Sequence, residues 1–312
     1  MIDQTTFGAP KGSPWDPVEP SFAGYQRPDR SVPALATLPP AGPVVTVVGT
    51  VRDEAVPLER SLAIWSKQRL PPWLRVEYLV IDDGSSDDPA SVVAAYRDRG
   101  MPVRYVRARG PGGPDRSCTL LFNAALRQIV RSPLVMFQWY DRIPGSFDHL
   151  RALVEPHRTR AGIVTSAISR HIGGSSSVEG MTPEVLAATL NLVDWRNRPE
   201  QLDLLAGPIG GHCVPGRSTE SSGCVWPVAE FVALGGYDER YVERAGYVNV
   251  ELFRRALQAG LTVAHPPENV SRNLHQSHIC ASRAQKTMGW LDDPHVRRNQ
   301  GIDWGRTSLD LG

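Results

Sequence analysis

Between residues 44 and 150 the chain alternates between two hydrophobic patterns. Continuous apolar runs rich in β-branched residues predict buried strands at 43–51, 76–82, 102–108 and 132–141. Apolar residues that recur every three to four positions predict helices between them, at 52–68, 88–100 and 116–130. Strands that alternate with helices are joined by crossover connections, so we expect an α/β fold with a mostly parallel sheet and helices on both faces.

The pattern is less regular after residue 150. Further strands are predicted at 161–169 and 261–266, and further helices at 182–196 and 250–260. Residues 206–224 are rich in glycine and serine and predict a loop. This loop contains His212 and is long enough to close over a bound ligand and exclude water.

The same pattern divides the chain into four parts. Residues 1–43 are rich in proline and glycine and predict an N-terminal arm. Residues 44–150 and 151–280 are predicted to be two halves of one domain, and residues 281–312 a polar C-terminal tail. With 312 residues, of which 41% are hydrophobic, the chain can bury a full-sized core.

Composition narrows the possible classes of protein. The 34 basic and 33 acidic residues leave a net charge of +1, so no global field attracts nucleic acid or an anionic membrane. The four cysteines are widely spaced and form no CxxC pair, which indicates neither a zinc site nor a disulfide framework. No run of 18 apolar residues and no signal-peptide pattern occurs, so we expect a cytoplasmic protein without a membrane span.

The first candidate chemistry is in the segment VIDDGSS, where Asp82 and Asp83 follow a predicted strand. Ligands of open parallel sheets bind beyond the carboxyl ends of the strands. A carboxylate at that place can accept the imide N–H of a uracil ring or hold a ribose hydroxyl. Alternatively, the segment forms only a tight turn and the N-cap of the next helix.

The order of several segments resembles a known family. TVVGTVRDEA, YLVIDDGSS, RSCTLLFNAAL and LVMFQWYDR follow one another as in the nucleotide-binding half of the GT-A glycosyltransferases, in particular family 2 and the polypeptide N-acetylgalactosaminyltransferases. GGYDERYVERAGYVNVELFRRALQAG is similar to their acceptor-side segment. The resemblance covers about residues 44–280. It implies a GT-A fold and a hexosyltransferase that moves a sugar from a nucleotide-sugar, with a UDP-sugar as the expected donor, to a hydroxyl of a protein or glycan.

The resemblance also implies roles for residues of the first half. Thr50 and Glu54 would flank the nucleobase, and Asp83, with Asp82 beside it, would bond the nucleotide. Arg116 would meet the diphosphate, because the donors of a guanidinium match phosphate oxygens. Alternatively, Arg116 is an ordinary surface arginine.

The metal motif of the family, Asp-x-Asp or Asp-x-His, is altered in this chain. One alignment of QWYDR places Trp139 at the first acidic position and Asp141 at the last, and the other places Gln138 and Tyr140 at the two positions. In both alignments Asp141 is the remaining carboxylate.

A second metal ligand is implied further along the chain. In the N-acetylgalactosaminyltransferases a histidine of a Ser-Arg-x-x-His segment completes the site, and SRNLH supplies His275 in that arrangement. The resemblance thus implies that Asp141 and His275, with His278 as the alternative histidine, bind Mn²⁺ or Mg²⁺ together with diphosphate oxygens.

The catalytic base of the inverting relatives is replaced as well. The resemblance places Asn249 at that position, and an amide cannot act as a general base. Asn249 would then bond the sugar or the acceptor, with Glu251 orienting it, and the leaving diphosphate would help to deprotonate the acceptor. This chemistry favours retention of configuration. Asp238 and Glu239 are the other candidate bases, although a role in the turn before the helix is favoured for them.

Two alternatives to a glycosyltransferase stay open. Because the metal motif and the base position both depart from the pattern, the chain could be a degenerate GT-A domain that binds a nucleotide-sugar or glycan without turnover. A nucleotidyltransferase is less favoured, because no glycine-rich phosphate loop with a lysine opens the first strand and helix.

Overall fold

The computed structural model describes residues 30–111, 118–172, 206–208, 219–239, 252–253, 255–257, 259–266 and 271–275. Only the backbone is described at 168–172, 206–208, 219–221, 272 and 275. The helix predicted at 182–196, His212 and the tail at 281–312 lie outside the described residues.

Strands and helices alternate in the first half of the domain, as the hydrophobic pattern predicts. The strands are β1 (Val45–Val51), β2 (Val76–Asp82), β3 (Val103–Arg107) and β4 (Leu134–Trp139). The helices between them are α1 (Ala55–Trp65), α2 (Pro89–Asp98) and α3 (Cys118–Gln128). The four strands are parallel in the order β3-β2-β1-β4, so the carboxyl ends of β1, β2 and β4 lie at one edge.

The second half of the domain extends the same sheet. It contains β5 (Arg142–Pro144), α4 (His149–Val154), a 3-10 helix η1 (Glu155–Arg158), β6 (Ile163–Ile172), β7 (Ala206–Pro208), β8 (Thr219–Pro227), α7 (Val228–Ala233), β9 (Thr262–Ala264) and β10 (Arg272–His275). The strand order continues as β4-β8-β6-β10-β5, and β7 and β9 pair with β6. Among the described residues, five of the nine strand pairings are parallel, which confirms a mostly parallel α/β sheet.

The prediction of a loop at 206–224 is wrong in part. Residues 206–208 form β7, and residues 219–224 belong to β8, which pairs with β4 and β6. Glycine and serine are uncommon in strands, but pairing on both sides satisfies the backbone groups of β8 and outweighs this weak preference. The short strands β5 and β10 were likewise not predicted. A lid that spans the whole of 207–223 is therefore excluded.

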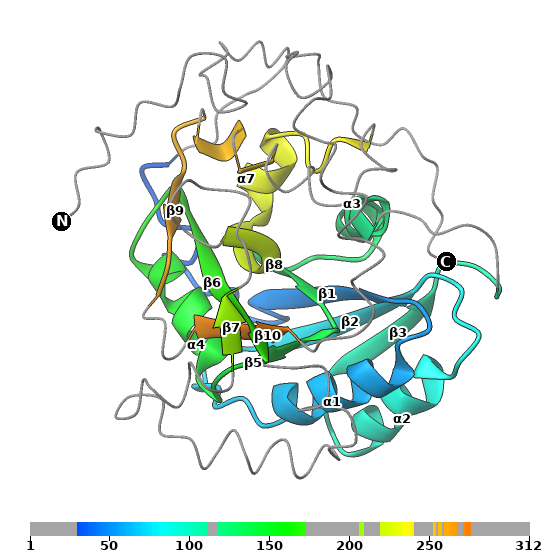
Figure 1. The fold of residues 1–312 in the computed structure, drawn as a ribbon. Helices are drawn as coiled ribbons and strands as arrows, with labels where there is room; N and C mark the ends of the chain where they lie inside the picture. The colour runs from blue at the N-terminus through cyan, green and yellow to red at the C-terminus, as the bar shows by residue number, and fades with distance from the viewer. Residues whose placement is uncertain are drawn as a thin grey trace.

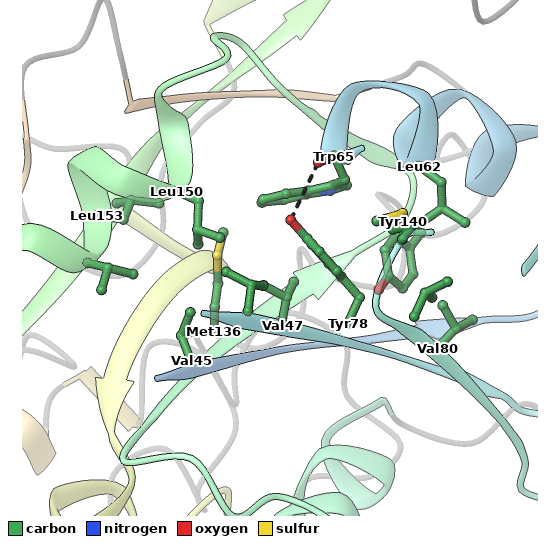
Figure 2. Close-up of a cluster of buried hydrophobic side chains, with 14 of the residues drawn as sticks. Val45, Val47, Leu62, Trp65, Tyr78, Val80, Met136, Tyr140, Leu150 and Leu153 are labelled. Atoms are coloured by element: carbon green, nitrogen blue, oxygen red, sulfur yellow. Dashed lines mark hydrogen bonds between the residues drawn. The ribbon is translucent and has the colours of Figure 1, made fainter. Parts of the chain in front are cut away.

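The parallel strands contribute side chains to two separate hydrophobic cores, because successive side chains of a strand point to opposite faces of the sheet. Val47, Val80 and Met136 pack on the side of α1 and α4, with Trp65 and Tyr78 (Figure 2). Their neighbours in the strands face the other core, which contains Val48, Leu79, Phe137, Phe122, Trp226, Phe231 and Tyr237. Figure 1 shows α1 and α2 on one side of the sheet and α3 and α7 on the other.

The described end of the predicted N-terminal arm packs on the domain. Leu35 is buried, and its N–H donates to the carbonyl of His157 (2.9 Å). Arg30 makes a two-point ion pair with Glu230 of α7 (2.5 and 2.8 Å) and donates to the carbonyl of Ala259 (2.7 Å). These contacts tie the described end of the arm to the second half of the domain. Among the described residues, no helix is long and apolar enough to cross a membrane.

Candidate functional site

Asp82 holds the turn that follows β2. It is fully buried, and its Oδ1 accepts hydrogen bonds from the N–H (2.8 Å) and the hydroxyl (2.6 Å) of Ser85. Its Oδ2 accepts the hydroxyl of Tyr105 (2.6 Å) and lies 3.6 Å from Nε of Arg107. Burial and the hydrogen bond to Asp82 raise the pKa of Tyr105 above its ordinary value. A ligand that approached Asp82 would have to displace Ser85 or Tyr105.

Asp83 is placed beside two arginines. Its Oδ2 accepts a hydrogen bond from Nη2 of Arg109 (2.9 Å) and lies 3.7 Å from Nη1 of Arg52. Nε of Arg109 donates to the backbone carbonyl of the same aspartate (3.0 Å). Gly84 makes this arrangement possible: its φ is +85°, and a Cβ atom there would lie 2.5 Å from the carbonyl oxygen of Gly110.

The loops after β1 and β2 are bonded to each other. Oδ1 of Asp53, a residue with φ of +53°, accepts the N–H (2.6 Å) and the hydroxyl (2.7 Å) of Ser86, and these bonds lower the pKa of Asp53. The N–H of Asp53 donates to Oγ of Ser85 (3.0 Å), and Oδ2 of Asp87 accepts the N–H of Ala55 (2.7 Å). The two loops therefore form one hydrogen-bonded unit at the carboxyl edge.

Thr50 and Glu54 belong to this edge. Thr50 is buried near the end of β1, where its backbone lies between Ile81 of β2 and Trp139 of β4. Glu54 is half-buried before α1, and its carbonyl accepts the N–H of Leu58 (2.9 Å). Since β2 and β4 flank β1, their carboxyl ends lie about 10 Å apart, or two strand spacings.

The side chains at the altered metal motif pack in the interior, and two of them make hydrogen bonds there. Gln138 is buried, with its Nε2 3.3 Å from Oδ1 of Asn273 and 3.4 Å from the carbonyl of Arg142. Nε1 of Trp139 donates to Sγ of Cys118 (3.2 Å). Tyr140 points into the core on the side of α1, as Figure 2 shows. None of these three residues supplies a carboxylate.

Asp141 and His275 come from adjacent places in the sheet. Asp141 follows β4 by two residues, is largely buried, and has its Oδ1 4.0 Å from Nε of Arg142. β10 runs antiparallel to β5, and the backbone of His275 lies opposite Arg142. The structure thus brings the SRNLH segment next to Asp141. The side chain of His275 is outside the described residues, and among the described ones no group of three or more His, Cys, Asp or Glu could hold a metal ion.

A buried polar network holds β10 in this position. Nδ2 of Asn273 donates to Oγ of Ser222 in β8 (3.1 Å), and the same Oγ accepts the N–H of Trp139 (3.3 Å). Gly223 has φ of +80°, and a Cβ there would lie 2.9 Å from Nδ2 of Asn273. These contacts connect the ends of β4, β8 and β10 without a charged group.

Asn123 joins the first half of the domain to the GGYDE segment of the second half, a role that the sequence analysis missed. From the middle of α3 its side chain accepts the N–H of Tyr237 (3.1 Å) and donates to the carbonyl of the same residue (2.8 Å). It also donates to Oε1 of Glu239 (2.9 Å), which accepts a further bond from Arg127 (3.1 Å). The signal in the sequence was an amide on the apolar face of a predicted helix, where a buried asparagine needs partners.

The structure does not describe every predicted site residue. Arg116, Asn249 and Glu251, as well as His278, lie outside the described residues, so their predicted roles stay predictions. Arg109 is the main addition at the turn after β2. No motif marks it, because only the fold brings the loop after β3 against Asp83.

Comparisons with known proteins agree with this architecture. Residues 46–178 match the model of glycosyl transferase family 2. No curated protein matches the chain.

Several solved structures are similar. A mannosyltransferase from Pyrobaculum calidifontis, in complex with GDP-Man and Mn²⁺, superposes with a TM-score of 0.54 at 15% identity, over 88% of this chain and 68% of that one. GalNAc-T7 with UDP, GalNAc and Mn²⁺ gives 0.51 at 16% identity, over 81% of this chain and 46% of that one. TarS 1-349 of S. aureus, in complex with UDP-GlcNAc, gives 0.50 at 14% identity, over 75% and 58%.

The chain thus spans less than two thirds of TarS 1-349 and of GalNAc-T7. At 14–16% identity these similarities concern the fold alone. The fold agrees with the parallel strands described above and with the match to the family model. The chain has the GT-A fold of glycosyltransferases, and its residues 46–178 are family 2-like.

Proposed function

We propose that the protein is a glycosyltransferase of the hexosyltransferase type. It moves a sugar from a UDP-sugar to a hydroxyl of a protein or glycan acceptor, assisted by Mn²⁺ or Mg²⁺. The observation that carries the proposal is the arrangement of the sheet edge. Asp83 follows β2 and Asp141 follows β4, and the carboxyl ends of these two strands lie about 10 Å apart on the two sides of β1.

The donor side fits a uridine nucleotide. Asp83 lies beside two guanidinium groups, and a carboxylate oxygen can accept the N3–H of uracil. Thr50 and Glu54 lie on the neighbouring β1 and its loop, where they would flank the base. Asp82 supports the turn from behind through Ser85 and Tyr105.

A metal ion would be held by Asp141 and His275. One carboxylate and one imidazole suit Mn²⁺ or Mg²⁺ when phosphate oxygens and water complete the coordination shell. The antiparallel pairing of His275 with Arg142 supports this assignment, because it places the histidine next to Asp141. Bound there, the ion would neutralise charge on the leaving diphosphate.

The roles of three further residues follow from the resemblance alone. Arg116 would contact the diphosphate before α3, Asn249 would bond the sugar or acceptor, and Glu251 would orient it. Without an enzymic base at position 249, the proposed outcome is retention of configuration.

Titration calorimetry with UDP, in the presence and absence of Mn²⁺, tests the proposal, together with hydrolysis of a panel of UDP-sugars. We expect binding that depends on the metal and is lost in Asp141→Ala and His275→Ala, as well as slow release of UDP from one donor. Arg104→Ala is a matched control, since this exposed residue of β3 pairs with Glu77 away from the carboxyl edge. Absence of binding to any UDP-sugar would refute the proposal.

One observation favours a second candidate, a domain that binds the donor without turnover. Gln138, Trp139 and Tyr140 fill the metal-motif segment with buried or packed side chains. This candidate predicts UDP binding that is indifferent to Mn²⁺, no donor hydrolysis, and no effect of Asp141→Ala on affinity.

A further inference from the structure

A cavity lies at the edge of the sheet opposite to the turn that carries Asp83. Its volume is about 420 Å³, and it is enclosed by the carboxyl-terminal ends of α1 and α2, by the start of β2 and by the segment that enters β3. Tyr78 of β2 lines the cavity and lies about 17 Å from Asp83 along the strand. The cavity is therefore separate from the edge that holds the carboxylates.

The walls of the cavity are largely aromatic and apolar. Trp65, Tyr78 and Met101 line it and are 1%, 2% and 7% exposed. The rings of Trp65 and Tyr78 are 5.7 Å apart, as their close packing in Figure 2 shows. Leu70 also lines the cavity and is one of the exposed large hydrophobic residues. Both the volume and the apolar lining are typical of sites for small molecules.

The charged groups of the cavity are all positive. Lys67 and Arg99 line it and are exposed, and no carboxylate lines it in the part of the chain that the structure describes. Nε1 of Trp65 is buried and has no hydrogen-bond acceptor among the described residues. A buried N–H without an acceptor is costly, and an oxygen atom of a ligand would supply one.

The two helix ends do not cancel this positive charge. Free carbonyls at a helix C-terminus disfavour anions, but N–H groups of the following residues cover several of them here. The N–H of Ser66 donates to the carbonyl of Leu62 (2.8 Å), and the N–H of Met101 donates to that of Tyr96 (3.1 Å). Lys67 and Arg99 follow these ends directly.

We propose that this cavity is a binding site for a small amphipathic anion, an aromatic molecule with one carboxylate, sulfonate or phosphate group. Its ring would pack on Trp65, Tyr78 and Met101, and its acidic group would meet Lys67 and Arg99. Cζ of Arg99 lies 5.1 Å from the centroid of the Tyr96 ring, a cation–π contact that holds this guanidinium against the wall. The inference does not depend on the proposed function, because it concerns the other edge of the sheet.

Naphthalene-1-sulfonate is a suitable probe, and 1-naphthalenemethanol is its neutral counterpart. Calorimetry on the full chain is expected to show saturable binding of the sulfonate, with the alcohol bound at least about tenfold more weakly. Equal affinities would contradict the role of Lys67 and Arg99. Absence of sulfonate binding would overturn the inference.

Two variants of Gly100 place the probe in the cavity. Gly100 lines it with φ of +88° and has no atom within 4 Å of its Cβ position, so aspartate and asparagine, which tolerate this conformation, both fit. Gly100→Asp adds a negative charge and should weaken sulfonate binding about fivefold or more. Gly100→Asn has the same shape without the charge and should bind within about twofold of the wild type.

Removal of the positive groups is the complementary test. Lys67→Ala and Arg99→Ala are changes of exposed side chains, and each should weaken sulfonate binding about three- to tenfold without affecting the alcohol. Sulfonate binding that is equal in Gly100→Asp and Gly100→Asn overturns the inference. Binding that is lost in Asp83→Ala but kept in Gly100→Asp would place the probe at the carboxyl edge and overturn it as well.

Discussion

The ends of β2 and β4 lie on either side of β1, yet they are built from different chemistry. The turn after β2 is held by charged groups, with Asp53, Asp82 and Asp83 bonded by serines, a tyrosine and arginines. The end of β4 is held by neutral amides and hydroxyls, in the chain of contacts from Gln138 through Asn273 to Ser222. The first region gathers acidic and basic side chains at the sheet edge, whereas the second encloses neutral polar groups in the core.

The difference shows how a fold can keep one half of a site while changing the other. At the turn after β2, the backbone geometry and the carboxylates depend on each other, because the groups that we propose bind a nucleotide also close the turn. At the end of β4, the packing of Trp139 and Tyr140 does not require an acidic residue.

The largest effect is expected at the turn after β2. Gly84→Val introduces a β-branched side chain at φ of +85° and a Cβ 2.5 Å from the carbonyl of Gly110. The free energy of unfolding should fall by about 3 kcal/mol or more, as measured by urea denaturation. Gly42→Val is a matched control, because Gly42 has φ of +81° but no atom within 4 Å of its Cβ position. Equal losses in the two variants would show that the approach of Gly110 does not matter.

The connection between the two halves gives the next largest effect. Asn123→Ala leaves the N–H and carbonyl of Tyr237 and the carboxylate of Glu239 without their bonds to this amide, in a buried place. We expect a loss of about 2 to 4 kcal/mol in the free energy of unfolding. Gln128→Ala, at the exposed end of α3, serves as the comparison and should cost less than about 0.5 kcal/mol. Comparable costs in both variants would contradict a structural role for Asn123.

The pH dependence of stability should distinguish the buried His157 from the carboxylates of the turn after β2. His157 is buried with its Nε2 3.1 Å from Oγ1 of Thr165, and burial lowers its pKa to about 3. Below pH 6.5 the unfolded chain binds a proton at this ring and the folded chain does not. The free energy of unfolding should therefore fall by up to about 1.4 kcal/mol for each pH unit between 6.5 and 4.5.

Urea denaturation of the wild type and of His157→Gln at several pH values measures this loss of stability. Glutamine can donate to Thr165 but cannot be protonated, so the free energy of unfolding of the variant should change less between pH 6.5 and 4.5. The carboxylate of Asp53 in the turn stays ionised over this range, because the hydrogen bonds from Ser86 lower its pKa. An equal slope in both proteins would assign the acid sensitivity to other groups.

The last pair of variants compares the two regions directly through UDP affinity. Asp83→Ala should weaken UDP binding by about 1.5 to 3 kcal/mol, the scale of a hydrogen bond to a charged group. Gln138→Leu should change it by less than about 0.5 kcal/mol, because Gln138 is buried in the network of Asn273. Calorimetry on both variants measures the difference. A larger loss in the Gln138 variant would reverse the comparison.

The sequence by itself determined the first half of the fold. Between residues 44 and 140 each strand and helix is signalled by local periodicity, because buried strands and amphipathic helices there are long and regular. The turn after β2 was also predictable, since glycine and serine after two aspartates carry their own backbone chemistry. The order of these segments was sufficient to indicate a GT-A fold.

Only the tertiary structure decided how the second half joins this sheet. β8 and β10 are short or rich in glycine and serine, and they form strands because β4, β5 and β6 supply hydrogen-bond partners from distant parts of the chain. The hydrogen-bond partners of Asp83 and Asn123 could not be predicted from the sequence for the same reason. Arg109 follows Asp83 by 26 residues and Tyr237 follows Asn123 by 114, so no local pattern records contacts that depend on the closed fold.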